Sequence, residues 1–425
     1  KKKYQHTMAT VTTQRINKTM LKKIIYLNFD LNRTVLMSDA AGGRSMDDTV
    51  NYLLSEISYG KVEKNDENTA RWIATGEAKP YPGNEVPDDR TLITYKAFGD
   101  NLYKYKTSGS VEDVAHNKTM KKHRKKLQSS FTNENNPGEK FRPYLVQVMS
   151  ALEMKDEATK TLAKNAAKII EPGLLKEFWE DGKYFLLPSF LNLLIYLQSD
   201  PALLANVRII YRTFGSDLEE VAKELDVFHQ GKHPLYPGIK LNDKLLLKEP
   251  YGVFFRNSDQ SDGTSLIVGT IDKAPKDCTD LKGFYDTSKI QIENGFQNCS
   301  NTITAMLLNN NNNQDNQQTL GLRDYWEWWH AHGESDDSGK ILILDSTKTD
   351  AEHHCFIDDH VEADHAHIVD VRDGATGSKI PFEKSINANI FRSEPFLAIT
   401  DNNYFINMFE NIVTISNKDE EGSNL

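Results

Sequence analysis

The chain has 425 residues, of which 38% are hydrophobic and 26% charged, and its formal net charge is −10. At roughly 150 residues per domain this length indicates two or three units, or one large domain with an insertion. The negative charge argues against broad nucleic-acid binding, which needs a positive face. Three scattered cysteines, Cys278, Cys299 and Cys355, are too few for a disulfide framework, so a reducing compartment is expected.

Neither a secretory signal nor a membrane span is predicted. No apolar run follows Lys1 to Lys3, so residues 1–20 are expected to form a polar tail. The longest apolar stretch, Phe185 to Leu197, contains Pro188, is too short to cross a bilayer and predicts a buried helix. We therefore expect a cytoplasmic protein, from a sequence that does not begin with Met and can lack upstream residues.

The first strong structural signal is Ile24 to Asp30, a short and nearly continuous apolar run rich in β-branched and aromatic residues. Such a run is typical of a central parallel strand that is buried on both faces. Asp30 stands at its carboxyl end, and ligands of open α/β sheets bind just outside the carboxyl ends of strands. From 47 to 57, Val50, Leu53, Leu54 and Ile57 fall on one helical face.

Farther along, residues 60–92 are rich in Pro, Gly and Asp and are expected to form loops. Helices are predicted over 144–154, 158–170, 174–179 and 190–197. A second buried strand is predicted over 207–213, followed by a helix that Ser216 or Asp217 caps and that ends at Leu225. Further strands are expected at 251–256, 265–269, 341–345, 354–358 and 366–371, which together indicate an α/β protein.

Four short motifs follow one another in a fixed order. Phe29-Asp30-Leu31-Asn32-Arg33-Thr34-Val35 follows the first strand, Thr213 ends the second, Lys340 follows Ser338-Gly339, and Asp358-Asp359 follow an apolar run. Together they resemble the haloacid dehalogenase-like superfamily over about residues 22–400. Arg212 to Gly215, Gly231 to Pro234 and Ile368 to Asp373 resemble a protist and algal branch of it.

The resemblance implies a Rossmann-like three-layer parallel sheet and gives each motif a role. Asp30 would attack phosphorus to form an acyl-phosphate and also help to hold Mg²⁺. The backbone carbonyl of Asn32 would be a further Mg²⁺ ligand, and Thr34 would steady the loop. Thr213 and Lys340 would hold phosphate oxygens, and Asp358, with Asp359, would complete the Mg²⁺ site.

One residue departs from the family pattern. Position 32 is Asn, where the superfamily commonly has an acid–base Asp, and an amide cannot exchange a proton near neutral pH. Three outcomes stay open: a slow phosphatase, an enzyme with another proton shuttle, or a phosphate-binding protein without turnover. The alternative to an enzyme is a catalytically inactive subunit that acts as a binding or scaffold component of a larger assembly.

The resemblance also divides the chain. Residues 21–38 and 206–400 would form the core, 39–205 a mostly helical insertion that acts as a cap over a phosphorylated small molecule, and 401–425 a C-terminal segment. Within the core, residues 309–318 are an Asn/Gln-rich segment that cannot build a core and is expected to form an exposed loop.

Three remaining clusters have ordinary explanations. His353, His354, His360, His365 and His367 lie near Cys355 but match no defined zinc spacing, whereas His360, beside the acidic pair, is a candidate active-site neighbour or proton donor. The basic run from Lys118 to Lys126 could bind phosphates, acidic lipid or an acidic partner, although such runs are more often solvated faces. Tyr325, Trp328 and Trp329 are expected in the core.

Overall fold

The computed structural model describes residues 21–418 except for 38–44, 67–68, 77, 84, 107–110, 257–262, 276, 309–317 and 363–365. The predicted tail (1–20) and all but the last residue of the Asn/Gln-rich segment lie outside the described residues. The chain divides into two compact units. The first comprises Lys1–Leu31, Pro188–Arg392 and Asn402–Leu425, and the second comprises Asn32–Leu187 and Ser393–Asp401.

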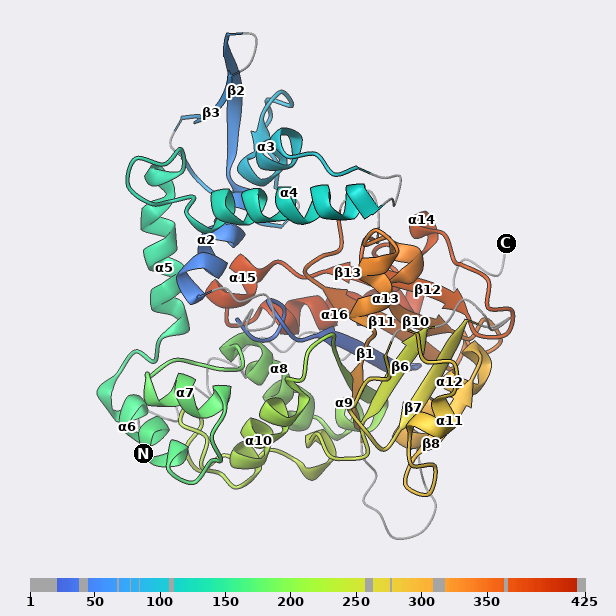
Figure 1. The fold of residues 1–425 in the computed structure, drawn as a ribbon. Coiled ribbons are helices and arrows are strands. Elements are labelled where there is room, and N and C mark those ends of the chain that lie inside the picture. The colour runs from blue at the N-terminus through green and yellow to red at the C-terminus, as the bar shows by residue number, and fades with distance from the viewer. Residues whose placement is uncertain are drawn as a thin grey trace. The chain divides into compact units, whose positions relative to one another are not determined.

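The first unit is built on an eight-stranded sheet with the order β13-β11-β1-β5-β9-β6-β7-β8 (Figure 1). Neighbours from β13 to β6 are parallel, and β7 and β8 are antiparallel additions at one edge. The strands are β1 (Ile24–Asp30), β5 (Val207–Thr213), β6 (Gly252–Arg256), β7 (Thr264–Val268), β8 (Gln291–Asn294), β9 (Thr319–Arg323), β11 (Glu352–Asp358) and β13 (Ile390–Arg392).

This sheet confirms the predicted α/β class with a mostly parallel central sheet. The expectation of a wholly parallel sheet is wrong at β7 and β8. Parallel neighbours need a crossover of a dozen or more residues, and only 257–263 join β6 to β7, so an antiparallel pair results. The strands predicted at 207–213, 251–256, 265–269 and 354–358 are present within one or two residues.

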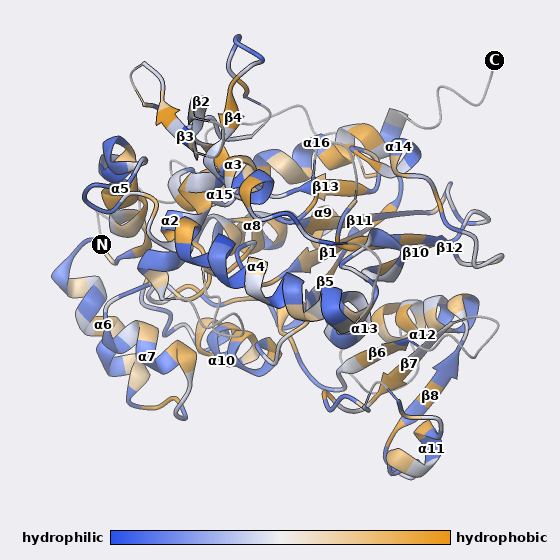
Figure 2. Cartoon of the chain, turned by 45° about the horizontal axis from the view of Figure 1, so that its top comes forward, coloured by the Kyte–Doolittle hydropathy of each residue, from blue (hydrophilic) through white to orange (hydrophobic). Residues whose placement is uncertain are grey.

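The central strands are apolar on both faces because both faces are covered. On one face, Phe29 of β1 packs edge-on against Phe190 and Phe405. These rings belong to α8 (Pro188–Ser199) and α16 (Tyr404–Lys418). On the other face, Tyr26 and Ile210 share a core with α12 (Phe296–Leu308) and with Ile341. Figure 2 shows the hydrophobic residues along these strands.

A separate two-stranded parallel sheet pairs β10 (Lys340–Leu344) with β12 (Val369–Asp373). It shares a core with Phe356 of β11 and Trp329. Tyr325 and Trp329 are buried as predicted, whereas Trp328 is half-buried. The remaining helices of this unit are α9 (Pro201–Asn206), α10 (Leu218–His229), η2 (Asp243–Leu245), α11 (Leu281–Phe284), α13 (Trp326–Ala331), η3 (Asp336–Ser338) and α14 (Phe382–Ser385).

The second unit is mainly helical with a small antiparallel sheet of order β3-β2-β4. Its core contains Trp72, Tyr95, Phe131 and Phe141, whose rings contact one another. The elements are α2 (Met46–Ile57), β2 (Tyr59–Asp66), β3 (Thr69–Ala74), β4 (Ile93–Thr94), α3 (Tyr95–Leu102), α4 (Val111–Ser129), η1 (Glu139–Phe141), α5 (Arg142–Leu152), α6 (Glu157–Ala167), α7 (Leu174–Glu180) and α15 (Pro395–Thr400).

Two local expectations for this part of the chain need correction. Residues 60–92 are not all loop, because β2 and β3 form a hairpin in which Val62 pairs with Trp72. The bounds of the second unit also differ from the predicted insertion at 39–205. The helices α8 and α9 belong to the first unit, and Ser393–Asp401 belongs to the second. Predicted helices at 47–57, 144–154, 158–170, 174–179 and 190–197 are present with shifted ends.

Candidate active site

Three predicted site residues end neighbouring strands of the first unit. In β1, Phe29 pairs with Ile357 of β11 and with Tyr211 of β5. The next residues therefore bring Asp30, Asp358 and the end of β5 to one edge of the sheet. This is the carboxyl edge at which ligands bind in open α/β sheets. Asp30, Asp358 and Thr213 are all buried there.

Lys340 joins two of these strand ends. Its Nζ donates to Asp30 Oδ1 and, at 2.8 Å, to Asp358 Oδ2. The lysine side chain is 2% exposed, and Asp358 is fully buried. Lys340 begins β10, where its N–H donates to Ile368 O at 2.7 Å. The structure thus brings together a carboxylate, an ammonium group and a second carboxylate from three distant parts of the chain.

The protonation of this cluster follows from burial and from its mixed charges. Burial raises the pKa of Asp30 to about 7; the attraction of Lys340 opposes this rise, and the charges of Asp358 and Asp359 add to it. Burial acts in the same direction on Asp358, but Lys340 and His360 outweigh it and hold the pKa of Asp358 below its usual range. Burial alone would lower the pKa of Lys340, but its two carboxylate partners raise it.

A second buried ion pair lies beside this cluster and was not expected from the sequence. Arg212 Nε donates to Asp324 Oδ2 at 3.0 Å, and Arg212 Nη2 donates to Asp324 Oδ1 at 2.5 Å. The third guanidinium nitrogen, Nη1, donates to Asn28 Oδ1 at 3.0 Å. Asp324 also contributes to the raised pKa of Lys340. In the sequence, the only signal was the presence of Asn28 and Arg212 inside mostly apolar strands, and Arg208 gives the same signal in β5.

Thr213 takes part in a local turn. Its Oγ1 accepts the N–H of Gly215 at 2.8 Å and donates to Asp217 Oδ2 at 3.3 Å. A Cβ on residue 215 would lie 2.5 Å from that carboxylate oxygen, so any larger residue there would displace the Asp217 side chain from this position. These contacts orient the Thr213 hydroxyl at the carboxyl end of β5. Stabilising this turn does not conflict with the predicted contact to a phosphate oxygen.

Asp359 and His360 extend the acidic end of β11. The N–H of His360 donates to Asp358 Oδ1 at 2.9 Å, and His360 Nδ1 lies 3.0 Å from Asp359 Oδ1. Asp358, Asp359 and His360 each offer a ligand atom within 4.8 Å of the others. Within the part of the chain that the structure describes, no such group joins Cys355 with the other histidines, and His365 is outside it.

Asn32 belongs to the second unit, where it forms a bridge with Leu36. The turn that follows is left-handed at Arg33, with φ of 65°. Arg33 Nη2 lies 2.6 Å from Glu56 Oε2, and the guanidinium lies 4.3 Å from the centre of the Tyr52 ring. Thr34 is fully buried. The contacts of Arg33 with Glu56 and Tyr52 therefore fix the loop after β1 against α2. A loop that positions a functional residue needs such support.

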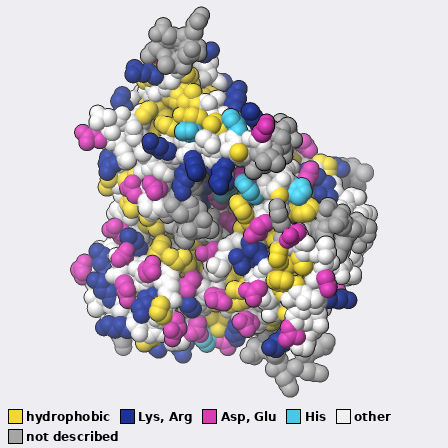
Figure 3. Space-filling view, in the orientation of Figure 1, with side chains coloured by type: hydrophobic (Ala, Val, Ile, Leu, Met, Phe, Trp, Pro, Cys, Tyr) yellow, Lys and Arg dark blue, Asp and Glu magenta, His cyan; other side chains and the backbone are white. Residues whose placement is uncertain are grey.

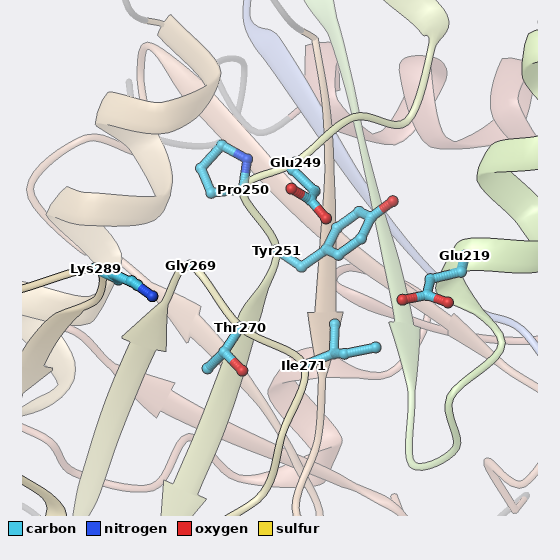
Figure 4. A pocket seen from close by; sticks show the side chains of 8 residues that line it. All are labelled: Glu219, Glu249, Pro250, Tyr251, Gly269, Thr270, Ile271 and Lys289. Atoms are coloured by element: carbon cyan, nitrogen blue, oxygen red, sulfur yellow. The ribbon is translucent and has the colours of Figure 1, made fainter. Parts of the chain in front are cut away.

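A hollow of about 510 Å³ lies elsewhere in the first unit, beside the start of β6 (Figure 4). None of the predicted site residues lines it. Figure 4 shows the Glu219 and Glu249 carboxylates near the Tyr251 ring, whose pKa is raised to about 12 by burial and then by these two charges. Two carboxylates face a single lysine, Lys289, in this lining, so its formal charge is −1 and it suits a phosphate less well than a cationic pocket would.

No protein-family model, curated protein or solved structure matches this chain. Fold and site therefore define only a class: an α/β protein whose mostly parallel sheet carries a buried, charged cluster at its carboxyl edge. Cys278, Cys299 and Cys355 are free thiols in this structure. Among the described residues no helix is both long and apolar enough to cross a membrane.

Proposed function

We propose that this chain is a Mg²⁺-dependent phosphohydrolase or phosphotransferase of the haloacid dehalogenase-like type, with Asp30 as its nucleophile. The observation that carries the proposal is the double contact of Lys340 with Asp30 and Asp358. Three residues that the resemblance assigned to one active site, and that are far apart in the sequence, meet at the ligand-binding edge of the sheet.

The charge of the cluster supports a divalent cation. Six buried side chains contribute: the carboxylates of Asp30, Asp324, Asp358 and Asp359 and the cations Arg212 and Lys340. With every group ionised their formal charge is −2, and buried charge of one sign is costly unless it is compensated. Carboxylate oxygens are the ligands that Mg²⁺ prefers. Asp30 and Asp358, with Asp359 and the carbonyl of Asn32, would hold the ion, which would neutralise phosphoryl charge.

In this proposal the Asp30 carboxylate donates an electron pair to phosphorus, and the bond from phosphorus to the leaving oxygen breaks. The result is an aspartyl-phosphate and an alkoxide that needs a proton. Water then attacks phosphorus and gives a proton to the same group that protonated the alkoxide, while the bond from Asp30 to phosphorus breaks. Inorganic phosphate is released and the Asp30 carboxylate is regenerated. Lys340 and the Thr213 hydroxyl would hold phosphate oxygens during both displacements.

The proton for the leaving group is the weak point, because Asn32 cannot supply it. His360 is the candidate proton-transfer group in its place. It follows Asp358 and Asp359 directly in the chain and contacts both. The insertion between the first two motifs would act as a cap that selects a phosphorylated small molecule, as the resemblance implies.

The same departure at position 32 supports a second candidate, a catalytically inactive member of the fold that serves as a binding or scaffold subunit. In that case the buried cluster would bind phosphate or an ion without turnover. Activity on a generic aryl phosphate, measured for the wild type beside Asp30→Asn, separates the two candidates.

Under the enzyme proposal we expect Mg²⁺-dependent turnover that Asp30→Asn abolishes, and trapping of the wild type by beryllium fluoride as an aspartyl-phosphate mimic. Turnover that survives Asp30→Asn would overturn the role of Asp30. Absence of both turnover and trapping at millimolar Mg²⁺ would leave the inactive subunit as the better reading.

A further inference from the structure

A row of lysines lies on one face of α4 in the second unit. Lys118, Lys122 and Lys126 are exposed and follow one another at intervals of four residues. Residues four apart lie on one face of a helix, about 6 Å from each other along the axis. Lys125 falls on the same face, about 20° around the helix from Lys118. Figure 3 shows Lys and Arg side chains gathered over this helix, and Figure 2 shows α4 as mostly hydrophilic.

The opposite side of α4 attaches the helix to its own unit. Arg124, which is about 200° around the helix from Lys122, pairs with Asp100 at 2.9 Å. The Arg124 guanidinium also lies 3.9 Å from the centre of the Tyr105 ring, and its Nε donates to Tyr103 O at 2.8 Å. Gln128 is buried. The lysine row is thus presented on a fixed helix whose other face is already occupied.

We propose that the lysine row of α4 is a docking surface for an acidic segment of a protein partner. The charges are complementary, and so is the spacing. Alternate residues of an extended strand point to the same side about 6.6 Å apart, close to the 6 Å step of the lysines. A segment with Asp or Glu at alternate positions therefore places one carboxylate opposite each of Lys118, Lys122 and Lys126.

The negative charge of the rest of the chain favours a narrow acidic protein segment over membranes and nucleic acids. With a net charge of −10, the protein repels a wide anionic surface such as a membrane or a duplex. At physiological salt the Debye length is about 8 Å, so a narrow segment in contact with the row is attracted while more distant acidic groups are screened. The three lysines of the row carry no aromatic ring for base stacking, and the neighbouring His123 ring is already stacked on Tyr103, so a single-stranded nucleic acid is the poorer match.

The test uses the full chain and a fluorescein-labelled peptide in which four Glu alternate with Ser, followed by fluorescence anisotropy. A triple variant, Lys118→Gln with Lys122→Gln and Lys126→Gln, keeps good helix formers at exposed positions. The matched control changes three other exposed lysines of the same unit, through Lys140→Gln, Lys155→Gln and Lys164→Gln. Both variants lose the same charge.

At 50 mM NaCl we expect the triple variant to bind the peptide about tenfold more weakly than the wild type, at roughly twofold per exposed ion pair. The control variant should differ from the wild type by less than about twofold, and Lys122→Gln alone by about twofold. Raising NaCl to 150 mM should weaken wild-type binding further.

Equal peptide binding by the wild type and the triple variant would overturn the proposal, as would an equal loss in both variants. The partner class would also be wrong if phosphatidylserine-containing vesicles or a single-stranded oligonucleotide bound the wild type more tightly than the peptide and lost that binding in the triple variant. The proposal does not depend on catalysis at Asp30, so failure of one leaves the other in place.

Discussion

Replacing Lys340 by Met tests whether the charged cluster is as deeply buried as its geometry indicates. Methionine keeps the length and apolar volume of the lysine stem but removes the ammonium group that contacts Asp30 and Asp358. Two buried carboxylates then face each other without a cation. Breaking a buried pair by removing one partner costs about 3–5 kcal/mol. For a unit of this size, we expect the melting temperature to fall by about 10 °C.

The loss should depend on pH in a defined direction. Without the ammonium group, burial raises the pKa of both carboxyl groups above the value of about 3.9 for an unfolded Asp. Between those values the folded state holds more protons than the unfolded chain, so stability falls as pH rises. The deficit of Lys340→Met relative to the wild type should therefore be greater at pH 7.5 than at pH 5.

The assay is thermal unfolding of the wild type and the variant at both pH values in the presence of EDTA. Adding Asp30→Asn to Lys340→Met should recover part of the loss, because only one buried carboxylate then remains unpaired. Lys348→Met is the matched control. Its pair with Asp345, at 3.1 Å, leaves the lysine side chain 35% exposed, and its loss should cost below about 1 kcal/mol. A loss for Lys340→Met as small as the control, or one independent of pH, would refute the buried-cluster reasoning.

Three further outcomes follow from the same site. Gly339→Ala would place a Cβ 2.1 Å from Ile368 O, so denaturant unfolding should show a loss of about 1–3 kcal/mol, and an unchanged midpoint would contradict this geometry. Asn32→Asp should raise kcat on an aryl phosphate by about 10² to 10⁴ if a missing acid limits the rate; no gain would locate the limit elsewhere. Mg²⁺ at a hundred times its Kd should stabilise the fold by about 2.7 kcal/mol, reversibly with EDTA, and Asp358→Asn should remove this effect.

The sequence predicted the parts of the fold that depend on local patterns. The apolar runs at 24–30 and 207–213 become β1 and β5 because central strands of a parallel sheet bury both faces. The hairpin of β2 and β3 was missed because charged residues interrupt its alternation, and its pairing of Val62 with Trp72 depends on an aromatic core assembled from elsewhere in the second unit. Phe190 likewise packs on Phe29, a long-range contact that no local pattern gives.

For the site too, the sequence predicted what depends on local patterns and missed what depends on long-range contacts. Asp30, Thr213 and Asp358 were expected at strand ends, and all three lie at one edge of the sheet. The pairing of Arg212 with Asp324 was out of reach, because the two residues are 112 positions apart and each is unremarkable alone. Their partnership is visible only when β5 and β9 lie side by side.

The proposed chemistry has two requirements, ligand binding and turnover, and the residues of this chain suit the first better than the second. Binding a divalent cation and a phosphate needs compensating charge and oxygen ligands, which in our proposal the buried carboxylates and Lys340 would supply. Turnover also needs a proton donor of suitable pKa, for which Asn32 is unsuited and His360 is the alternative. Magnesium binding would therefore be shared by an enzyme and an inactive descendant of one. Only the formation of an aspartyl-phosphate at Asp30, and its decay on a time scale that changes on His360→Asn, distinguishes catalysis from binding.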